Sequence, residues 1–149
     1  MPEQVSKEEL NQRWRLTWIE SIFEFSNLKY QKILWVDGSM EQWPDDQERR
    51  SDFYDCYADY FDGQWLNKGY SIHVKEGRVS QKEAEVAQEF HLLADAYHQI
   101  ASDDPEIILK DLEWIRITKS AKKLWDYLKD TTTSPREIEL MNSLDRDFG

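Results

Sequence analysis

The chain has 149 residues, of which 40% are hydrophobic and 13% are aromatic. This size and composition are typical of one folded domain with one hydrophobic core, which we expect to span residues 1–149. Its 30 acidic residues outnumber its 19 basic residues and give a formal net charge of −11. A field of that sign repels phosphate backbones and anionic membranes, so we expect basic protein partners and no direct binding to nucleic acid.

The sequence carries no export or membrane signal. Residues 1–10 contain no apolar run of the kind that a secretory signal needs, and they include several acidic residues. The longest apolar runs, 33–36 and 107–109, are far shorter than the ~20 residues that cross a bilayer. A lone cysteine, Cys56, forms no internal disulfide. We therefore expect a cytoplasmic protein in a reducing compartment.

The first predicted helix begins at a capping box and ends near Ser26. Ser6 can cap the first turn, and Glu9 can reach back to the backbone of Ser6. Apolar residues then recur every three or four positions, which places them on one helical face: Leu10, Trp14, Trp18, Ile22 and Phe25.

A second apolar segment, 28–36, is expected to be a short helix, although 33–36 alone also fits a strand. Asp37 and Gly38 end it in a turn, and residues 40–44 form a loop. Asp45 or Asp46 is expected to open the next helix, which runs to Phe61 and stops near Asp62 and Gly63.

Residues 64–79 contain Gly69 and Gly77 and show no regular period, so helix, strand and loop remain open there. A second capping box, Ser80 to Glu83, predicts the start of a long helix. The core face expected for this helix consists of Val86, Phe90, Leu93, Tyr97 and Ile100.

The last third of the chain is also helical in pattern. Asp104 and Pro105 combine an N-cap with a proline at the first helical position. The helix is expected to break within 113–118 and to continue to Lys129. After the threonines 131–133, residues 134–137 again combine a cap, a proline and a capping-box acid. The predicted fold is all-α, a compact single-domain bundle of about six helices with short loops.

The most informative pattern is an acidic stripe. Residues 41–62 hold eight carboxylates and two arginines, a net charge of −6. On a helix that advances about 100° per residue, six of the acids fall within roughly 100° of one another. These six residues are Asp45, Glu48, Asp52, Asp55, Asp59 and Asp62. The aromatic residues of the same helix, Phe53, Tyr54, Tyr57, Tyr60 and Phe61, lie on nearly the opposite face and are expected to point into the core.

Two interpretations of the stripe remain open. It can be the solvated face of an acidic protein, because charge runs commonly mean no more than that. It can also be a docking surface, because neighbouring like charges cost ~0.2–0.5 kcal/mol per pair and a basic partner would relieve that repulsion. Trp43 and Trp65 lie in the flanking loops and are candidate anchors, with burial in the core as their alternative role.

No pattern predicts catalysis, a metal or a cofactor. His91, Asp95 and His98 share a helical face, but the expected core face turns them toward solvent, and no second half of a metal site is present. Cys56 lies beside carboxylates that disfavour its thiolate, so we expect a buried small side chain. The chain also lacks nucleophile-elbow, phosphate-loop and dinucleotide-binding glycine patterns.

Three segments carry a resemblance to a known family: Trp18 to Trp35, Tyr57 to Gly63, and Glu89 to Tyr97. Together they resemble small bacterial immunity proteins paired with contact-dependent growth-inhibition toxins. That resemblance implies a cytoplasmic protein that binds the C-terminal toxin domain of a cognate effector, often a nuclease with a basic cleft. It carries over no individual binding residue.

The leading hypothesis is therefore an immunity protein that does no chemistry. It would cover the basic active-site cleft of a toxin, as a monomer in a 1:1 complex. The first alternative is an acidic helical adaptor that regulates another basic protein. The second alternative is a small metal-dependent hydrolase that uses His91, Asp95 and His98.

Overall fold

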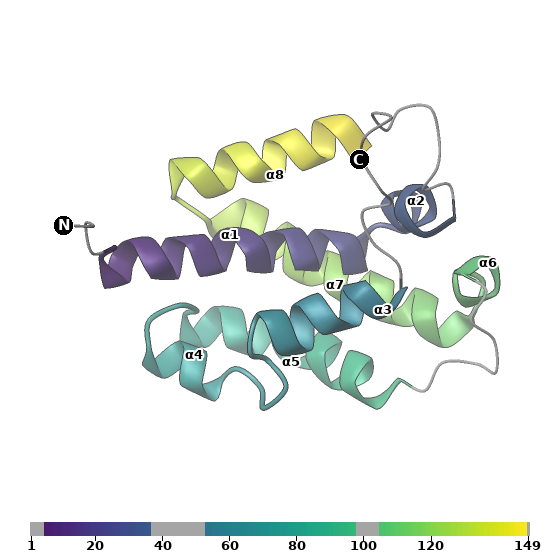
Figure 1. The fold of residues 1–149 in the computed structure, drawn as a ribbon, viewed down its shortest axis with the longest axis horizontal. Helices are drawn as coiled ribbons and strands as arrows, with labels where there is room; N and C mark the ends of the chain where they lie inside the picture. The colour runs from purple at the N-terminus through teal and green to yellow at the C-terminus, as the bar shows by residue number, and fades with distance from the viewer. Residues whose placement is uncertain (1–4, 37–52, 98–104, 149) are drawn as a thin grey trace.

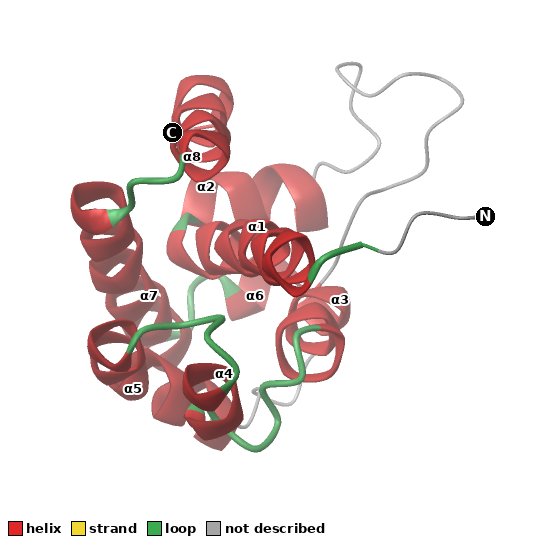
Figure 2. Cartoon of the chain, turned by 90° about the vertical axis from the view of Figure 1, so that its left-hand side faces the viewer, coloured by secondary structure: helices red, strands yellow, loops and turns green. Residues whose placement is uncertain are grey.

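The computed structural model describes residues 5–36, 53–97 and 105–148, and every regular element in these ranges is helical. The all-α prediction is confirmed. Helix α1 (Lys7–Ser26) runs through the middle of the molecule, and α8 (Pro135–Phe148), α7 (Leu112–Thr131), α5 (Gln81–Ala96) and α3 (Phe53–Ala58) surround it (Figures 1 and 2). Among the described residues, none of the helices has the length and apolarity needed to span a bilayer.

The N-terminal helices begin where the sequence predicts. Only the Ser6 half of the first capping box is present, however, because the Glu9 carboxylate binds Arg13 and Arg136. The Ser6 hydroxyl accepts a hydrogen bond from the amide of Glu9 and caps α1. Residues 28–36 are helical, as α2 (Leu28–Gln31) and the π-helical turn η1 (Lys32–Val36), so the strand alternative is wrong. The Asn27 side chain caps α2 by accepting from the amide of Tyr30.

The central elements differ more from the sequence-based expectation. The described part of the acidic helix consists of α3 and a π-helical turn, η2 (Asp59–Gly63). Its predicted start at Asp45 or Asp46 lies outside the described residues. Residues 64–79 include a short helix, α4 (Ser71–Lys75). Ser80 and Glu83 form the predicted capping box of α5, with both of its hydrogen bonds present.

The break predicted within 113–118 is wrong in position. Helix α6 (Pro105–Ile108) ends earlier, and α7 begins at Leu112 because Asp111 caps it by accepting from the amide of Glu113. The sequence interpretation missed Asp111 as an N-cap. The proline start of α8 is confirmed at Pro135.

The core forms where α7 packs against α1 and α5. The C-terminal half of α1 is buried on nearly all sides, whereas its N-terminal half is amphipathic, with Leu10 exposed. Four tryptophans are fully buried in this core: Trp18, Trp35, Trp114 and Trp125. Phe25 links the elements, because its ring contacts those of Tyr57, Tyr60, Phe90 and Trp114.

Candidate functional site

The predicted partner-binding residues divide into two groups. Trp43, Asp45, Glu48 and Asp52 lie outside the described residues. Asp55, Asp59 and Asp62 are exposed on α3 and η2, and Trp65 follows Gln64, the C-cap of η2.

The π-helical turn changes how the acids are spaced. A π-helix bonds residue i to i+5 and therefore turns less per residue than the 100° assumed for the stripe. The faces of this helix accordingly differ from those predicted. Tyr54 was expected in the core and is 52% exposed, whereas Tyr60 is fully buried and Tyr57 and Phe61 are partly buried against the core. Asp55, Asp59 and Asp62 nevertheless all remain at the surface.

The acidic side chains on this surface are close enough to affect one another. Partial burial raises the pKa of the Asp59 carboxyl, and the charge of Asp55 raises it further. Within the described part of the chain, neither Asp59 nor Asp62 forms an ion pair. Asp59 and Asp62 therefore present negative charge that no described residue pairs with.

Trp65 occupies a backbone position that favours glycine. The amide of Trp65 donates to the Asp62 carbonyl at 3.3 Å, and the amide of Leu66 donates to the Phe61 carbonyl at 3.0 Å. These two bonds form a Schellman motif that ends η2 and requires a left-handed residue after the cap. Trp65 has a φ of 57° and is 69% exposed. A non-glycine residue in this conformation costs ~1–2 kcal/mol, and the exposed indole returns little packing energy.

Hydrogen bonds from buried aromatic groups hold this corner in place. The Trp14 indole donates to the Gln64 carbonyl at 3.0 Å, and His73 Nε2 lies 2.7 Å from the Trp65 carbonyl. His73 stacks on Trp14, with ring centroids 4.6 Å apart. Because Arg78 donates to His73 Nδ1 at 3.1 Å, Nδ1 must be an acceptor and Nε2 must carry the proton. Burial lowers the pKa of His73 and favours this neutral form, the Trp65 hydrogen bond opposes that shift, and the charge of Arg78 adds to it.

A groove of about 320 Å³ lies beside the Trp65 side chain. Its lining consists of Lys7, Leu10, Asn11, Trp14, Gly63, Trp65 and Arg78. Leu10 and Trp65, both more than half exposed, provide apolar surface at this groove. Lys7 pairs with Glu76 at 3.2 Å, which offsets one of the two cations.

The outward orientation predicted for the His91 trio is wrong for His91. Its ring is buried, and Nδ1 lies 2.9 Å from the Tyr60 hydroxyl. The helix is rotated relative to the prediction, because Ala87, Phe90, His91 and Ala94 are its buried face. Asp95 is exposed, and His98 lies outside the described residues. No cluster of three or more His, Cys, Asp or Glu side chains in the described ranges could hold a metal ion.

His91 lies at the end of a row of hydrogen-bonded side chains in the core. Trp18 can only donate, so its indole fixes Tyr70 as the acceptor at 3.0 Å. The Tyr70 and Tyr60 hydroxyl oxygens lie 2.6 Å apart, and the Tyr60 hydroxyl lies 2.9 Å from His91 Nδ1. Burial lowers the pKa of His91, while the charge of Asp95 raises it, and the net effect favours the neutral ring.

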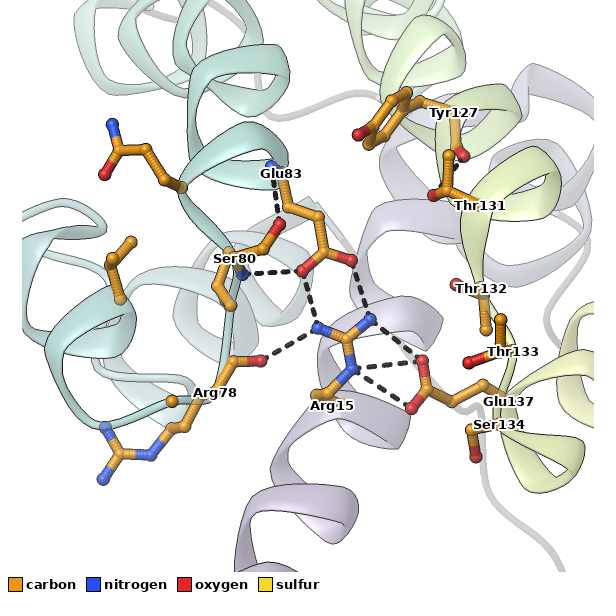
Figure 3. A pocket seen from close by; sticks show the side chains of 14 residues that line it. Arg15, Arg78, Ser80, Glu83, Tyr127, Thr131, Thr132, Thr133, Ser134 and Glu137 are labelled. Atoms are coloured by element: carbon orange, nitrogen blue, oxygen red, sulfur yellow. Dashed lines mark hydrogen bonds and ion pairs between the residues drawn. The ribbon is translucent and has the colours of Figure 1, made fainter.

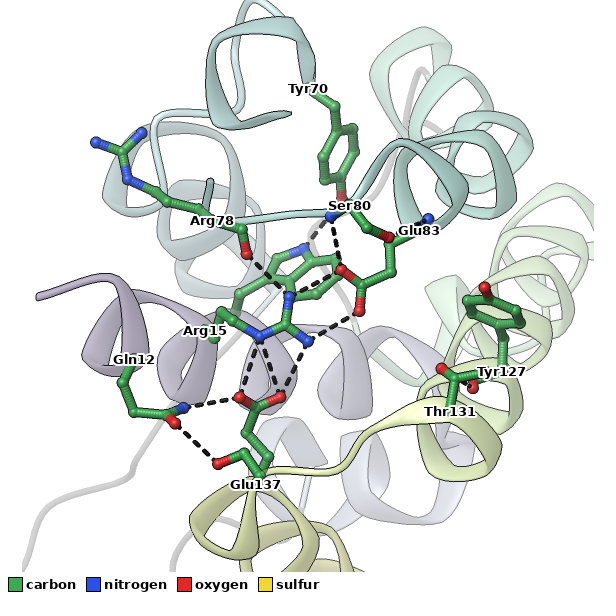
Figure 4. Close-up of polar contacts among 11 residues, drawn as sticks. Gln12, Arg15, Tyr70, Arg78, Ser80, Glu83, Tyr127, Thr131 and Glu137 are labelled. Atoms are coloured by element: carbon green, nitrogen blue, oxygen red, sulfur yellow. Dashed lines mark hydrogen bonds and ion pairs between the residues drawn. The ribbon is translucent and has the colours of Figure 1, made fainter. Parts of the chain in front are cut away.

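A buried ionic cluster around Arg15 was not predicted. Arg15 forms a two-bond pair with Glu83, with both distances 2.9 Å, and also binds Glu137 at 3.0–3.1 Å and the Arg78 carbonyl at 2.9 Å (Figures 3 and 4). Gln12 donates to Glu137 and accepts from Ser134. Burial alone would lower the pKa of Arg15, but its bonds to Glu83 and Glu137 outweigh burial and raise it.

This cluster fastens helices together and leaves Arg15 no capacity for a ligand. It ties α1 to the start of α5 and to α8, and the contacts of Arg15 use all three guanidinium nitrogens. A depression of about 630 Å³ beside it is lined by the threonines 131–133 and Tyr127 (Figure 3). Because Glu83 and Glu137 neutralise Arg15, the cluster is a structural clamp between three helices.

Comparisons with protein-family models, curated proteins and solved structures found no match to this chain.

Proposed function

We propose that this protein is an inhibitor of the immunity type, which binds a basic toxin domain and covers its active-site cleft. The observation that carries the proposal is the acidic surface of α3 and η2, where Asp59 and Asp62 lack ion-pair partners in the described ranges. Such a surface steers a basic partner into contact and selects against acidic ones.

The nature of the partner is supported by the resemblance to contact-dependent immunity proteins. The three segments that carry the resemblance meet in the core, where Phe25 contacts Tyr57 and Phe90. The binding residues are proposed from charge and exposure.

The test begins with the partner that the tagged protein retains when it is isolated from its native cell. We expect a basic protein domain with nuclease or other toxic activity, and we expect stoichiometric addition of the purified chain to abolish that activity. A partner that is acidic, or one whose activity is unchanged by saturating amounts of the chain, would contradict the proposal.

Charge reversal locates the surface. Asp59→Lys combined with Asp62→Lys should weaken inhibition, because two attractive contacts become repulsive. The matched control reverses Asp130, in the last turn of α7, and Glu139 on α8, which are both exposed. Helix α8 lies on the opposite side of α1 from α3 (Figures 1 and 2). Equal inhibition by both double variants would exclude the α3 and η2 surface as the docking site.

A further inference from the structure

The strained backbone conformation of Trp65 costs stability, and burial of its side chain does not offset that cost. A glycine would satisfy the same Schellman bonds without steric cost. The indole is 69% exposed, so its burial does not offset the strain. Residues that break a local rule without a structural gain are expected at functional sites.

The surroundings of Trp65 fix its direction. The Asp62 carbonyl accepts from its amide, its own carbonyl lies against His73, and the preceding carbonyl accepts from Trp14. The backbone is therefore held on both sides of the residue, and the side chain projects from a rigid corner. A rigid, exposed aromatic group loses little entropy on binding, which is why tryptophan is enriched among binding hot spots.

The groove beside Trp65 can accept one apolar side chain. Its volume of about 320 Å³ and its Leu10, Trp14 and Trp65 walls suit an aliphatic or aromatic group. The negative charge that favours cationic flanks lies outside the groove lining, on Asp59 and Asp62 of η2, and the lining cation Lys7 pairs with Glu76. Arg78 is the remaining cation of the lining, and it donates to His73.

We infer that Trp65 and the adjoining groove are the anchor point for a protein segment in which an apolar side chain is flanked by basic residues. This inference rests on the proposed function and specifies its contact chemistry. The apolar side chain fills the groove between Leu10 and Trp65, and a flanking guanidinium stacks on the indole and faces Asp62. The acidic surface contributes to the rate of encounter, and the anchor contributes to the lifetime of the complex.

The test uses the full chain, labelled with ¹⁵N, and three short peptides. The peptides are Ac-Gly-Arg-Leu-Arg-Gly-NH₂, its Arg-Gly-Arg analogue without the apolar side chain, and its Glu-Leu-Glu analogue with reversed charge. The indole N–H signals of the chain are separate probes, and the Trp65 signal is assigned by its loss in Trp65→Phe. Titration to millimolar peptide should shift this signal with Arg-Leu-Arg, more weakly with Arg-Gly-Arg, and not with Glu-Leu-Glu.

A Trp65→Gly variant provides the energetic test. It should lower the affinity for the Arg-Leu-Arg peptide roughly fivefold or more. It should also melt at the same temperature as the wild type or higher, because glycine relieves the strained conformation. Trp65→Phe should retain most of the affinity.

The outcomes separate the anchor from the acidic surface. If Arg-Leu-Arg shifts the backbone signals of Asp59 and Asp62 but not the Trp65 indole, the acidic surface stands and the anchor is refuted. A response to Glu-Leu-Glu as strong as that to Arg-Leu-Arg would refute the predicted charge of the occupant and would assign the groove to an acidic segment at Arg78. If none of these signals moves with any peptide, both the anchor and the docking role of the acidic surface fail.

Discussion

Replacing Arg15 with methionine removes the centre of the clamp between α1, α5 and α8 while keeping a side chain of similar length. Glu83 and Glu137 would then face each other without their shared cation. Both carboxylates are largely buried, with side-chain exposures of 11% and 4%. The variant therefore leaves two uncompensated charges inside the protein.

The expected loss is large relative to the stability of a domain. Removing one partner of a buried ion pair costs about 3–5 kcal/mol, because the remaining charge has lost its solvation and gained nothing in return. For a chain of this size, each kcal/mol lowers the melting temperature by about 2–4 °C. Arg15→Met should therefore melt about 6–20 °C below the wild type.

Urea and thermal unfolding followed by circular dichroism measure this loss. The matched control is Arg13→Met on the same helix, because Arg13 is exposed and pairs with Glu9 at the surface. Exposed pairs of this kind are worth about 0.3–0.5 kcal/mol. The deficit of Arg15→Met should also shrink between pH 7 and pH 5, because a carboxylate without its cation takes up a proton more readily when folded than when unfolded.

In the wild type, the stability contributed by Glu83 decreases as the pH falls, which is the opposite of the change expected for the carboxylates of Arg15→Met. Burial raises the pKa of Glu83, but the hydrogen bonds from Arg15 and Ser80 outweigh burial and lower it below its ordinary 4.5. Its contribution is therefore present above pH 4.5 and is lost as the pH falls through the lowered value. A deficit in Arg15→Met below about 1 kcal/mol, or one that equals the Arg13→Met deficit at every pH, would refute the clamp.

Three further predictions concern His91, Ser80 and Cys56. Burial lowers the pKa of His91 below its ordinary 6.5, so the wild type should lose stability as the pH falls below 6.5. His91→Gln should flatten that decline, measured by urea unfolding between pH 7 and pH 5.5. An unchanged pH dependence of the unfolding free energy would contradict a neutral His91 ring. Ser80→Ala should cost about 1 kcal/mol by the same assay, because it removes the cap of α5, whereas a cost near zero would mean that Glu83 alone holds this end. Cys56 should react with a thiol reagent only after unfolding, and rapid labelling of the native protein would contradict its 1% exposure.

The helical period and the caps predicted much of the fold. Ser6, Ser80 and Pro135 begin helices as expected, because local side-chain chemistry determines helix starts. The π-helical turns at 32–36 and 59–63 were not predicted, because the apolar period was assessed for an α-helix of 3.6 residues per turn. The rotated face of α5 was not predicted either, since His91 is buried by its bond to Tyr60 and by ring contacts with Phe61 and Tyr70.

The candidate site was only partly accessible to sequence reasoning. Trp65 was named from its loop position, but its left-handed backbone depends on contacts with His73 and Trp14 from other elements. The Arg15 cluster was missed because its partners lie 68 and 122 residues away along the chain. Glu83 carried a signal as a capping-box acid, and it performs that role and the ionic one together.

The association rate constant of the co-isolated partner, measured across a range of salt concentrations, tests the docking role of the acidic surface most directly. For the wild type we predict fast association that slows steeply as salt rises. Asp59→Asn combined with Asp62→Asn should slow association by about tenfold at low salt and should flatten the salt dependence, with less change in the dissociation rate. Identical rates and identical salt dependence for the wild type and this variant would contradict electrostatic docking through α3 and η2.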